Sequence, residues 1–272
     1  METRQVKLAV KGVHKTFRIK NKETGQDSFL NVLGSVGFDV YQGEIVSLIG
    51  ESGCGKTTLL RIVQGLIKLD AGTIEVEGVP VSTPGRDRGF VFQQASLLPW
   101  RSARANVEFG LELQGISKEE RRKRADDLLK LVGLGHAADQ YPHQLSGGMQ
   151  QRIGLARALA IDPEILLMDE PFSALDAQTR EVLQAELLRI QAETGKTTLF
   201  VTHDLDEAIY LSNRIVVLAA KPGRVKRIVD VPFAHPRPPL PELRGDPQFQ
   251  RIRAEIWELI RTGAAANAAD AA

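Results

Sequence analysis

The chain has 272 residues, of which 43% are hydrophobic and 25% are charged. A chain of this length can bury a large core, and its composition is that of an ordinary globular protein rather than a disordered one. The net charge of +1 gives no long-range attraction for a polyanion, which argues against nucleic acid as a partner.

Cysteine usage and hydropathy indicate the cellular setting. Cys54 is the one cysteine, so no intrachain disulfide can form, and the N-terminus lacks the apolar run of a secretory signal. The longest apolar runs, at 165–168 and 215–220, have the length of strands and fall far short of the roughly 20 residues of a membrane helix. We expect a cytoplasmic protein that reaches a membrane only through a partner.

Strands are predicted where apolar residues alternate or run continuously. In chain order they fall at 36–40, 44–49, 74–76, 89–92, 165–168 and 198–201, followed by a hairpin of 214–219 with 225–231. Helical patterns separate several of them. Ser117 and Glu120 form a capping box that opens one helix, and Asp176 caps another that ends near Gly195. Alternating strands and helices predict an α/β fold with a mainly parallel sheet.

The organisation along the chain predicts one main domain with an insertion. The domain is expected at 5–231, and a helical lobe without strands is expected as an insertion at about 95–150. Residues 232–262 combine a proline-rich connector with an amphipathic helix. The alanine-rich tail 263–272 is expected to be disordered.

A phosphate-binding loop follows the predicted strand 44–49. It matches the pattern G-x-x-x-x-G-K-S/T, and a helical stretch comes directly after it. Its glycines let successive backbone N–H groups and the helix N-terminus point at phosphate oxygens. The alternative, a glycine-rich turn without a ligand, is disfavoured by this context. The loop and the start of its helix comprise Gly50, Glu51, Ser52, Gly53, Cys54, Gly55, Lys56, Thr57 and Thr58.

Three side chains of this loop have specific expected roles. Lys56 should reach the β- and γ-phosphates, the Thr57 hydroxyl should ligate Mg²⁺, and Thr58 should contact a phosphate oxygen. Cys54 is expected to fill the loop as a small residue, although a thiol at this position would be easy to modify.

Two carboxylates follow the buried strand 165–168. Such a strand end delivers polar groups to the ligand edge of an open α/β sheet. Asp169 is the candidate magnesium residue, and Glu170 is the candidate general base for the attacking water. Alone, the pair could equally cap the next helix, but a phosphate-binding loop in the same chain favours catalysis.

The sequence Leu-Ser-Gly-Gly-Met-Gln-Gln-Arg at 145–152 resembles the signature motif of ABC ATPases. Ser146, Gly147 and Gly148 begin a predicted helix, whose positive dipole end attracts phosphate. In isolation the same residues would be an ordinary helix cap. The resemblance implies that the signature of one subunit closes on the γ-phosphate held by the other, so that two ATP molecules are sandwiched in a head-to-tail dimer.

Further motifs of that family occur in the expected order. Gln93 resembles the Q-loop glutamine that senses magnesium or water, with Gln94 as a competitor. Asp176 lies in a segment that resembles the D-loop at the dimer interface, and His203 resembles the switch histidine that contacts the γ-phosphate. Phe17 is the candidate for stacking on adenine, with a role in the core as the alternative.

The resemblance spans roughly 5–262 and implies a P-loop NTPase core of the RecA-like type, with an antiparallel β subdomain and an inserted α-helical subdomain. It implies ATP hydrolysis with Mg²⁺ and a second ATPase subunit, by default another copy. It also implies integral membrane permease subunits, an indirect solute-binding protein, and a place at the cytoplasmic face of the inner membrane.

Two regions resemble the importer branch that handles nitrate, sulfonates and taurine: Leu-Leu-Pro-Trp at 97–100 and the form of the C-terminal helix. Residues 97–100 could contact a permease or belong to the core of the lobe. An ABC ATPase of a non-transport membrane complex, such as a cell-division type, stays open as an alternative. A P-loop kinase is disfavoured, because it would have no use for the signature.

Overall fold

The computed structural model describes residues 4–20 and 26–269, and for 262–269 the backbone alone. These residues form two compact units, one of 1–84 with 199–272 and one of 85–198. The expected helical lobe at 95–150 lies inside the second unit, which extends beyond it in both directions.

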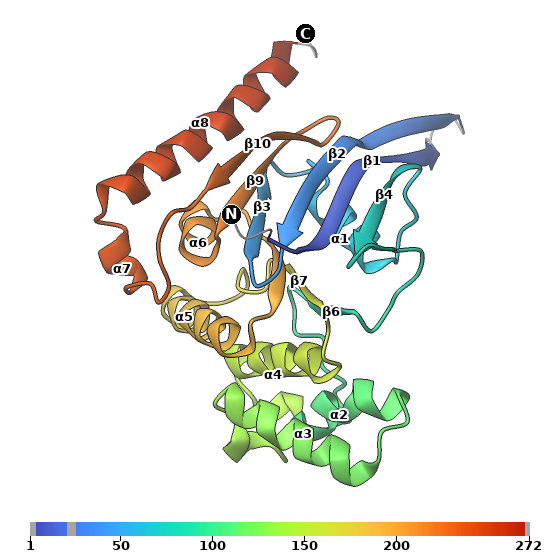
Figure 1. The fold of residues 1–272 in the computed structure, drawn as a ribbon, viewed down its shortest axis with the longest axis vertical. Helices are drawn as coiled ribbons and strands as arrows, with labels where there is room; N and C mark the ends of the chain where they lie inside the picture. The colour runs from blue at the N-terminus through green and yellow to red at the C-terminus, as the bar shows by residue number, and fades with distance from the viewer. Residues whose placement is uncertain (1–3, 21–25, 270–272) are drawn as a thin grey trace. The chain divides into compact units, whose positions relative to one another are not determined.

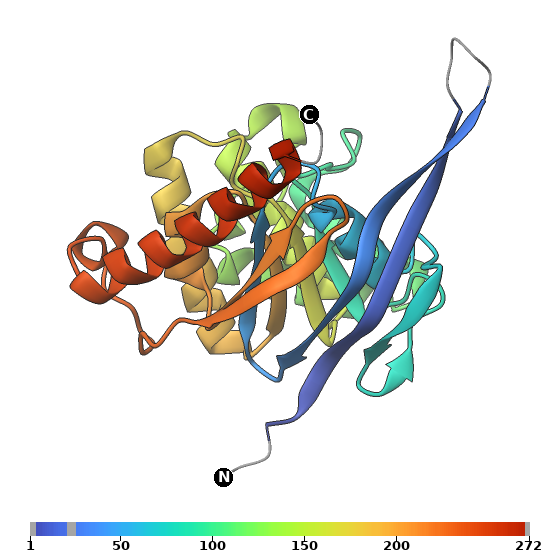
Figure 2. The ribbon, with the colours of Figure 1, turned by 90° about the horizontal axis from the view of Figure 1, so that it is seen from above.

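An antiparallel sheet in the first unit contains two long strands, β1 (Val6–Lys20) and β2 (Asp27–Tyr41). The strand order is β2-β1-β4-β5, with β4 at Ala71–Val76 and β5 at Val79–Pro80. Figure 2 shows β1 and β2 as a long two-stranded ribbon. The predictions found only the parts of β2 and β4 where apolar residues alternate. The rest of β2 and all of β1 were missed.

The reason for the miss lies in the pairing of β1 with β2. Its register shifts between Val10 and Val13 and again between Lys15 and Thr16. Each irregularity interrupts the period of two on which strand prediction depends. The backbones of β1 and β2 therefore pair along their length, although their side chains do not alternate regularly between apolar and polar.

A second sheet in this unit runs in the order β10-β9-β3-β8. Strand β3 (Ile45–Gly50) is fully buried and lies parallel to β9 (Arg214–Ala219), which pairs antiparallel with β10 (Arg224–Asp230). Strand β8 (Thr197–Val201) is buried throughout. Both the hairpin and the buried central strands agree with the predictions, because continuous apolar runs are typical of strands covered on two faces.

The helices of the first unit are α1 (Lys56–Gln64), α6 (Leu205–Leu211), α7 (Leu240–Leu243) and α8 (Pro247–Ala269). The expected amphipathic helix is α8, whose Phe249 and Ile256 are fully buried. It continues to Ala269, so most of the tail that was expected to be disordered is helical, and 270–272 lie outside the described residues.

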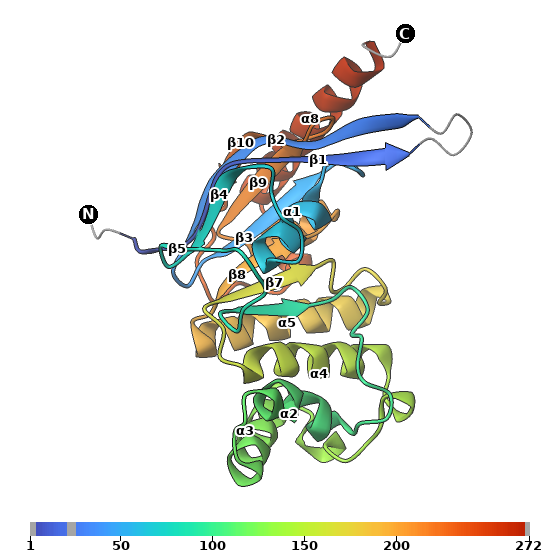
Figure 3. The same ribbon diagram turned by 90° about the vertical axis from the view of Figure 1, so that its right-hand side faces the viewer.

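The second unit combines two parallel strands with a helical layer. Strand β6 (Arg88–Val91) pairs in parallel with β7 (Ile165–Asp169). The helices are α2 (Ala103–Leu113), α3 (Lys118–Leu131), α4 (Gly147–Ala160) and α5 (Ala177–Thr194), with 3₁₀ turns at Gly135–Ala137 and Pro142–Gln144. Helices α4 and α5 lie side by side (Figure 3).

Two helix starts in this unit agree with the sequence. The Ser117 side chain accepts a hydrogen bond from the backbone N–H of Glu120, and the Asp176 side chain accepts one from Thr179. Gly195 ends α5 in the left-handed conformation. These ends were predictable because a helix cap depends on residues within one turn.

Across the described residues, no helix is both long enough and apolar enough to cross a membrane.

Candidate nucleotide-binding and catalytic site

The phosphate-binding loop connects β3 to α1, as predicted. Gly53 and Gly55 have φ angles of 80° and 94°, in the left-handed region that favours glycine. A Cβ atom at Gly50 would lie 2.5 Å from the carbonyl oxygen of Leu218, so this position tolerates no side chain. A Cβ at Gly53 would meet nothing within 4 Å. Glycine at 53 and 55 therefore allows the left-handed turns of the loop, and the space around Gly53 is open.

Lys56 lies across this loop. Its ammonium group donates hydrogen bonds to the carbonyl oxygens of Gly50, at 2.8 Å, and Glu51, at 3.1 Å. The side chain is 8% exposed, while Ser52 and Gly53 are exposed and Thr57 and Thr58 are half-buried. The ammonium also donates to the Cys54 sulfur at 3.7 Å. None of these acceptors is a carboxylate, so the buried ammonium carries a charge that an anion can neutralise. This arrangement fits a phosphate group.

Cys54 does not have the reactivity that its place in the loop suggested. Its side chain is fully buried, and burial raises the pKa of its thiol, although nearby Lys56 acts in the opposite direction. Because the thiolate is the reactive form, a buried thiol with a raised pKa reacts slowly. The full burial of Cys54 argues against easy modification and agrees with the expectation of a small residue that fills the loop.

Phe17 is half-buried on β1, opposite Leu30 of β2. The Lys15 ammonium lies 5.3 Å from the centre of its ring. Further along β2, Val32 lies close to Gly55. A Cβ atom added at Gly55 would lie 3.1 Å from a side-chain carbon of Val32. The pair of strands that carries Phe17 thus packs directly on the phosphate-binding loop, which suits contact with a base attached to a bound phosphate.

His203 follows β8 and is exposed. The next residue, Asp204, caps α6 by accepting hydrogen bonds from the backbone N–H groups of Asp206, at 2.9 Å, and Glu207, at 3.1 Å. The backbone of His203 is therefore fixed by its neighbour Asp204 at the N-terminus of α6.

In the second unit, Asp169 and Glu170 end β7, and both are half-buried. Glu170 has a φ of 46°, a left-handed conformation that costs a non-glycine residue of order 1 kcal/mol. The alternative that these acids cap the next helix is wrong, because the cap of α5 is Asp176. A strained carboxylate at a strand end is typical of functional sites.

Gln93 contacts the same loop. Its amide nitrogen donates to the Ser173 hydroxyl at 3.0 Å, and that hydroxyl donates to the carbonyl oxygen of Glu170 at 2.9 Å. The amide oxygen of Gln93 is thereby left as the group that could ligate a metal. Gln93 and Gln94 are both exposed, and the connection through Ser173 favours Gln93 of the two.

The signature residues begin α4. The Ser146 hydroxyl caps the helix by accepting from the N–H of Met149 at 3.3 Å, so the ordinary capping role exists. Ser146 and Gly147 are exposed, whereas Gly148 is buried, and a Cβ there would lie 2.8 Å from Thr179 of α5. Packing against α5 thus explains Gly148, while Ser146 and Gly147 are open to a ligand.

Asp176 is exposed at the start of α5. Hydrogen bonds from Thr179 hold the pKa of its carboxyl below the usual range. A role in a dimer interface stays a prediction, and the capping role is established.

Two polar residues of α4 that the sequence analysis did not single out hold the segment around Gln93. The Gln151 amide, which is 5% exposed, donates to the carbonyl oxygen of Phe92 at 2.8 Å. Arg157 donates to the carbonyl oxygens of Ala95 and Ser96, at 2.8 and 2.9 Å. Polar residues on the buried face of a predicted helix were the available signal.

Residues 97–100 are only partly in the core of the lobe. Trp100 is 71% exposed, while Leu97 and Leu98 are half-buried. The fully buried Asn106 accepts from the N–H of Leu98 at 2.8 Å, so this segment is fixed to α2. Trp100 is therefore held at the surface and does not belong to the core.

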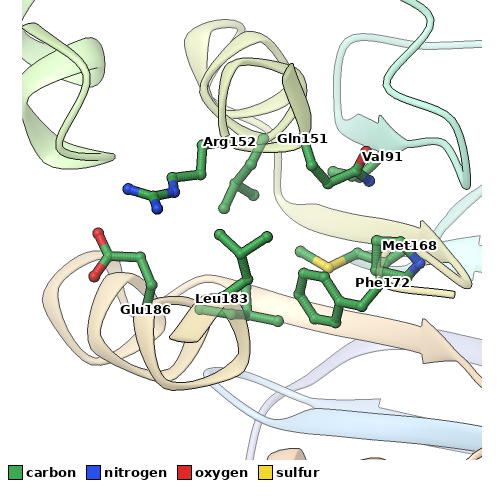
Figure 4. Close-up of a pocket in the computed structure, with 10 residues that line it drawn as sticks. Val91, Gln151, Arg152, Met168, Phe172, Leu183 and Glu186 are labelled. Atoms are coloured by element: carbon green, nitrogen blue, oxygen red, sulfur yellow. The ribbon is translucent and has the colours of Figure 1, made fainter. Parts of the chain in front are cut away.

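A cavity of about 20 Å³ lies between α4 and α5 (Figure 4). Its wall is mostly apolar, and Arg152 and Glu186 face each other at one side. That volume is enough for about one water molecule, whereas ligand pockets measure roughly 300–1,000 Å³. The cavity is a packing defect and not the nucleotide site.

The fold and these loops define an α/β nucleotide-hydrolysing protein of the P-loop class. A family model for the ABC transporter matches residues 33–173. The chain belongs to the ABC transporter family, as an ATP-binding subunit that hydrolyses ATP to drive transport.

Similar proteins agree with this assignment. The chain is 49% identical over 257 residues to an uncharacterized ABC transporter ATP-binding protein of Methanocaldococcus jannaschii, covering 94% of this chain and 92% of that one. It is 45% identical over 227 residues to the taurine import ATP-binding protein TauB of Yersinia pestis, covering 82% of this chain and 89% of that one. A dimeric ATP-binding cassette solved in a post-hydrolysis state with ADP and Pi matches with a TM-score of 0.71 and 37% identity, over 84% of this chain and 100% of that one.

Proposed function

We propose that this chain powers the import of a small solute of the nitrate, sulfonate or taurine type through a separate permease, at the cytoplasmic face of the membrane. The identity of 45% to a taurine import protein supports the solute class. The exposed Trp100 follows Leu98, whose backbone Asn106 of α2 holds, and it offers the permease an apolar contact.

The single observation that carries the catalytic part is the geometry of Glu170. Its left-handed backbone at the end of β7 and its link to Gln93 through Ser173 suit a carboxylate that is held in place for a reaction. In the proposed mechanism Glu170 takes the proton of the attacking water. Gln93 positions this water, and His203 contacts the γ-phosphate.

Binding of the ATP phosphates and base is assigned to residues of the first unit. Lys56 and the loop N–H groups hold the β- and γ-phosphates, Thr58 contacts a phosphate oxygen, and Phe17 stacks on the adenine. Thr57 in the first unit, and Gln93 and Asp169 in the second, each offer an oxygen atom of the kind that Mg²⁺ accepts as a ligand. When bound, Mg²⁺ neutralises charge on the phosphates.

Two copies of the chain are proposed to close head to tail around two ATP molecules. Ser146 and Gly147, exposed at the N-terminus of α4, would then face the γ-phosphate held by the loop of the other copy, with Gly148 securing the helix against α5. Asp176 would lie at the interface. Each copy contains every motif that a shared site needs, which favours a homodimer.

Mixing two inactive variants tests the shared site. Lys56→Ala removes the phosphate ligand, and Ser146→Arg blocks the signature, so each variant alone should not hydrolyse ATP. In a mixed dimer one site keeps both an intact loop and an intact signature. An equimolar mixture should therefore recover roughly a quarter of the wild-type turnover, because half of the dimers are mixed and one of two sites works.

The matched control combines both substitutions in one chain. Mixed with Lys56→Ala, this double variant cannot form an intact site, and turnover should stay at background. If the first mixture also stays at background although the mixed dimers form, the two motifs do not act across a dimer interface.

A further inference from the structure

The C-terminal segment, residues 232–261, packs on α6. Phe249, Ile252 and Ile256 of α8 are buried, as are Leu240 and Leu243 of α7. Helix α8 runs beside α6 and the β9–β10 hairpin (Figures 1 and 2). Lys226 of β10 also donates to the carbonyl oxygen of Leu259 at 2.6 Å. The segment is thus attached along much of its length and forms a fixed support.

Helix α6 depends on its surroundings for its position. It has seven residues, and an isolated helix shorter than about 12 residues is marginal in water. Its first turn is held by Asp204, directly after His203. Its last carbonyl groups lack partners within the helix and need donors from elsewhere.

Arg237 of the connector supplies these donors. Its guanidinium group donates to the carbonyl oxygens of Ile209, Tyr210 and Ser212. Arg237 is 9% exposed, and burial lowers its pKa to about 10, so it stays charged at neutral pH. A cation at the C-terminus of a helix is also favoured by the helix dipole.

Asp206 provides a second attachment. It accepts hydrogen bonds from Arg244, at 2.8 Å, and from Arg253 of α8, at 2.9 Å. Both arginine side chains are more than 40% exposed, and exposed ion pairs contribute little. The buried contacts of Arg237 are therefore the main polar link between the C-terminal segment and α6.

From these contacts we infer that Arg237 is a positioning residue for ATP hydrolysis, which acts on His203 by fixing α6 against the C-terminal segment. The inference rests on the proposed role of His203. Because α6 starts two residues after His203, a shift of the helix moves the imidazole. A displacement of about 1 Å in a catalytic group can cost on the order of a hundredfold in rate.

The test combines Arg237→Met with His203→Ala. Arg237→Met keeps much of the side-chain volume but removes the donors. It should lower kcat about tenfold or more while leaving the KM for ATP within about twofold, since the phosphate-binding loop is untouched. Arg237→Lys, which keeps the charge and some donors, should recover part of the loss. Arg251→Met, an exposed arginine of α8, is the matched control and should behave as wild type.

Measuring Arg237→Met in the His203→Ala chain shows whether Arg237 acts by positioning His203 or by stabilising the fold in general. There, Arg237→Met should cause little further loss, because the group it positions is already gone. Equal losses in both backgrounds, or an unchanged kcat for Arg237→Met, would overturn the inference. If Arg237→Met does not fold, Arg237→Lys is compared in the same two backgrounds with the same criteria.

The proposed function has its own readout in this experiment. His203→Ala alone should lose most turnover. If it hydrolyses ATP at the wild-type rate, the assigned role of His203 is wrong, and the role of Arg237 falls with it. If His203→Ala is impaired and Arg237→Met is not, only the inference about Arg237 fails.

Discussion

Glu170→Gln should lower ATP turnover by roughly two to four orders of magnitude, the range that a general base contributes. The substitution keeps the size of the side chain and removes its ability to take a proton from water. Binding of ATP should persist, because the phosphate-binding loop is unchanged. The variant should therefore accumulate as an ATP-bound dimer, which size exclusion in ATP and Mg²⁺ would detect beside a steady-state turnover assay.

Glu119→Gln is the matched control for this prediction. Glu119 is an exposed carboxylate in the first turn of α3, in the same unit, and its replacement should leave turnover unchanged. If Glu170→Gln hydrolyses ATP normally, the water is activated by another group, and the strained backbone at Glu170 serves a different purpose.

Lys56→Ala should weaken ATP binding and lower turnover on the order of a hundredfold or more, the effect of removing one preorganised charged donor. The ammonium of Lys56 is bound to the carbonyl oxygens of Gly50 and Glu51, so it is already directed at the loop. Titration with a fluorescent ATP analogue and a turnover assay would measure both effects.

Lys68→Ala serves as the control, because Lys68 is exposed in the same unit and has no assigned role. Wild-type affinity and turnover in Lys56→Ala would show that the backbone N–H groups of the loop suffice to hold the phosphates.

The features that could be predicted from the sequence are local. The phosphate-binding loop depends on glycines within eight residues and on the strand and helix that flank it. The caps at Ser117 and Asp176 depend on one helical turn. The buried strand before Asp169 and Glu170 was visible as a continuous apolar run. Because each of these signals lies in a short segment, each can be recognised in the sequence without knowledge of the tertiary structure.

The features that were missed depend on contacts distant in sequence. Gln151 reaches Phe92 across 59 positions, and Arg237 reaches Ile209 across 28. No local pattern shows which carbonyl groups a glutamine or an arginine will meet. The left-handed conformation of Glu170 is likewise imposed by its surroundings, because glutamate has no preference for it.

Cys54 shows how a correct motif can still mislead. Ser52 and Gly53 before it are exposed, yet the Cys54 side chain faces the interior and is fully buried. Sequence places a residue in a loop but does not give the direction of its side chain. Similarly, Trp100 could have been core or surface by composition, and only the structure shows that it is 71% exposed.

The measurement that tests the central claim most directly is solute uptake driven by this chain together with its permease in liposomes. With ATP enclosed on the side of this chain, labelled taurine or a related sulfonate or nitrate should be imported, and Glu170→Gln should stop uptake. Uptake of such a solute that depends on ATP and on Glu170 would support the proposal. ATP hydrolysis by a purified complex that moves none of these solutes in the import direction would contradict it.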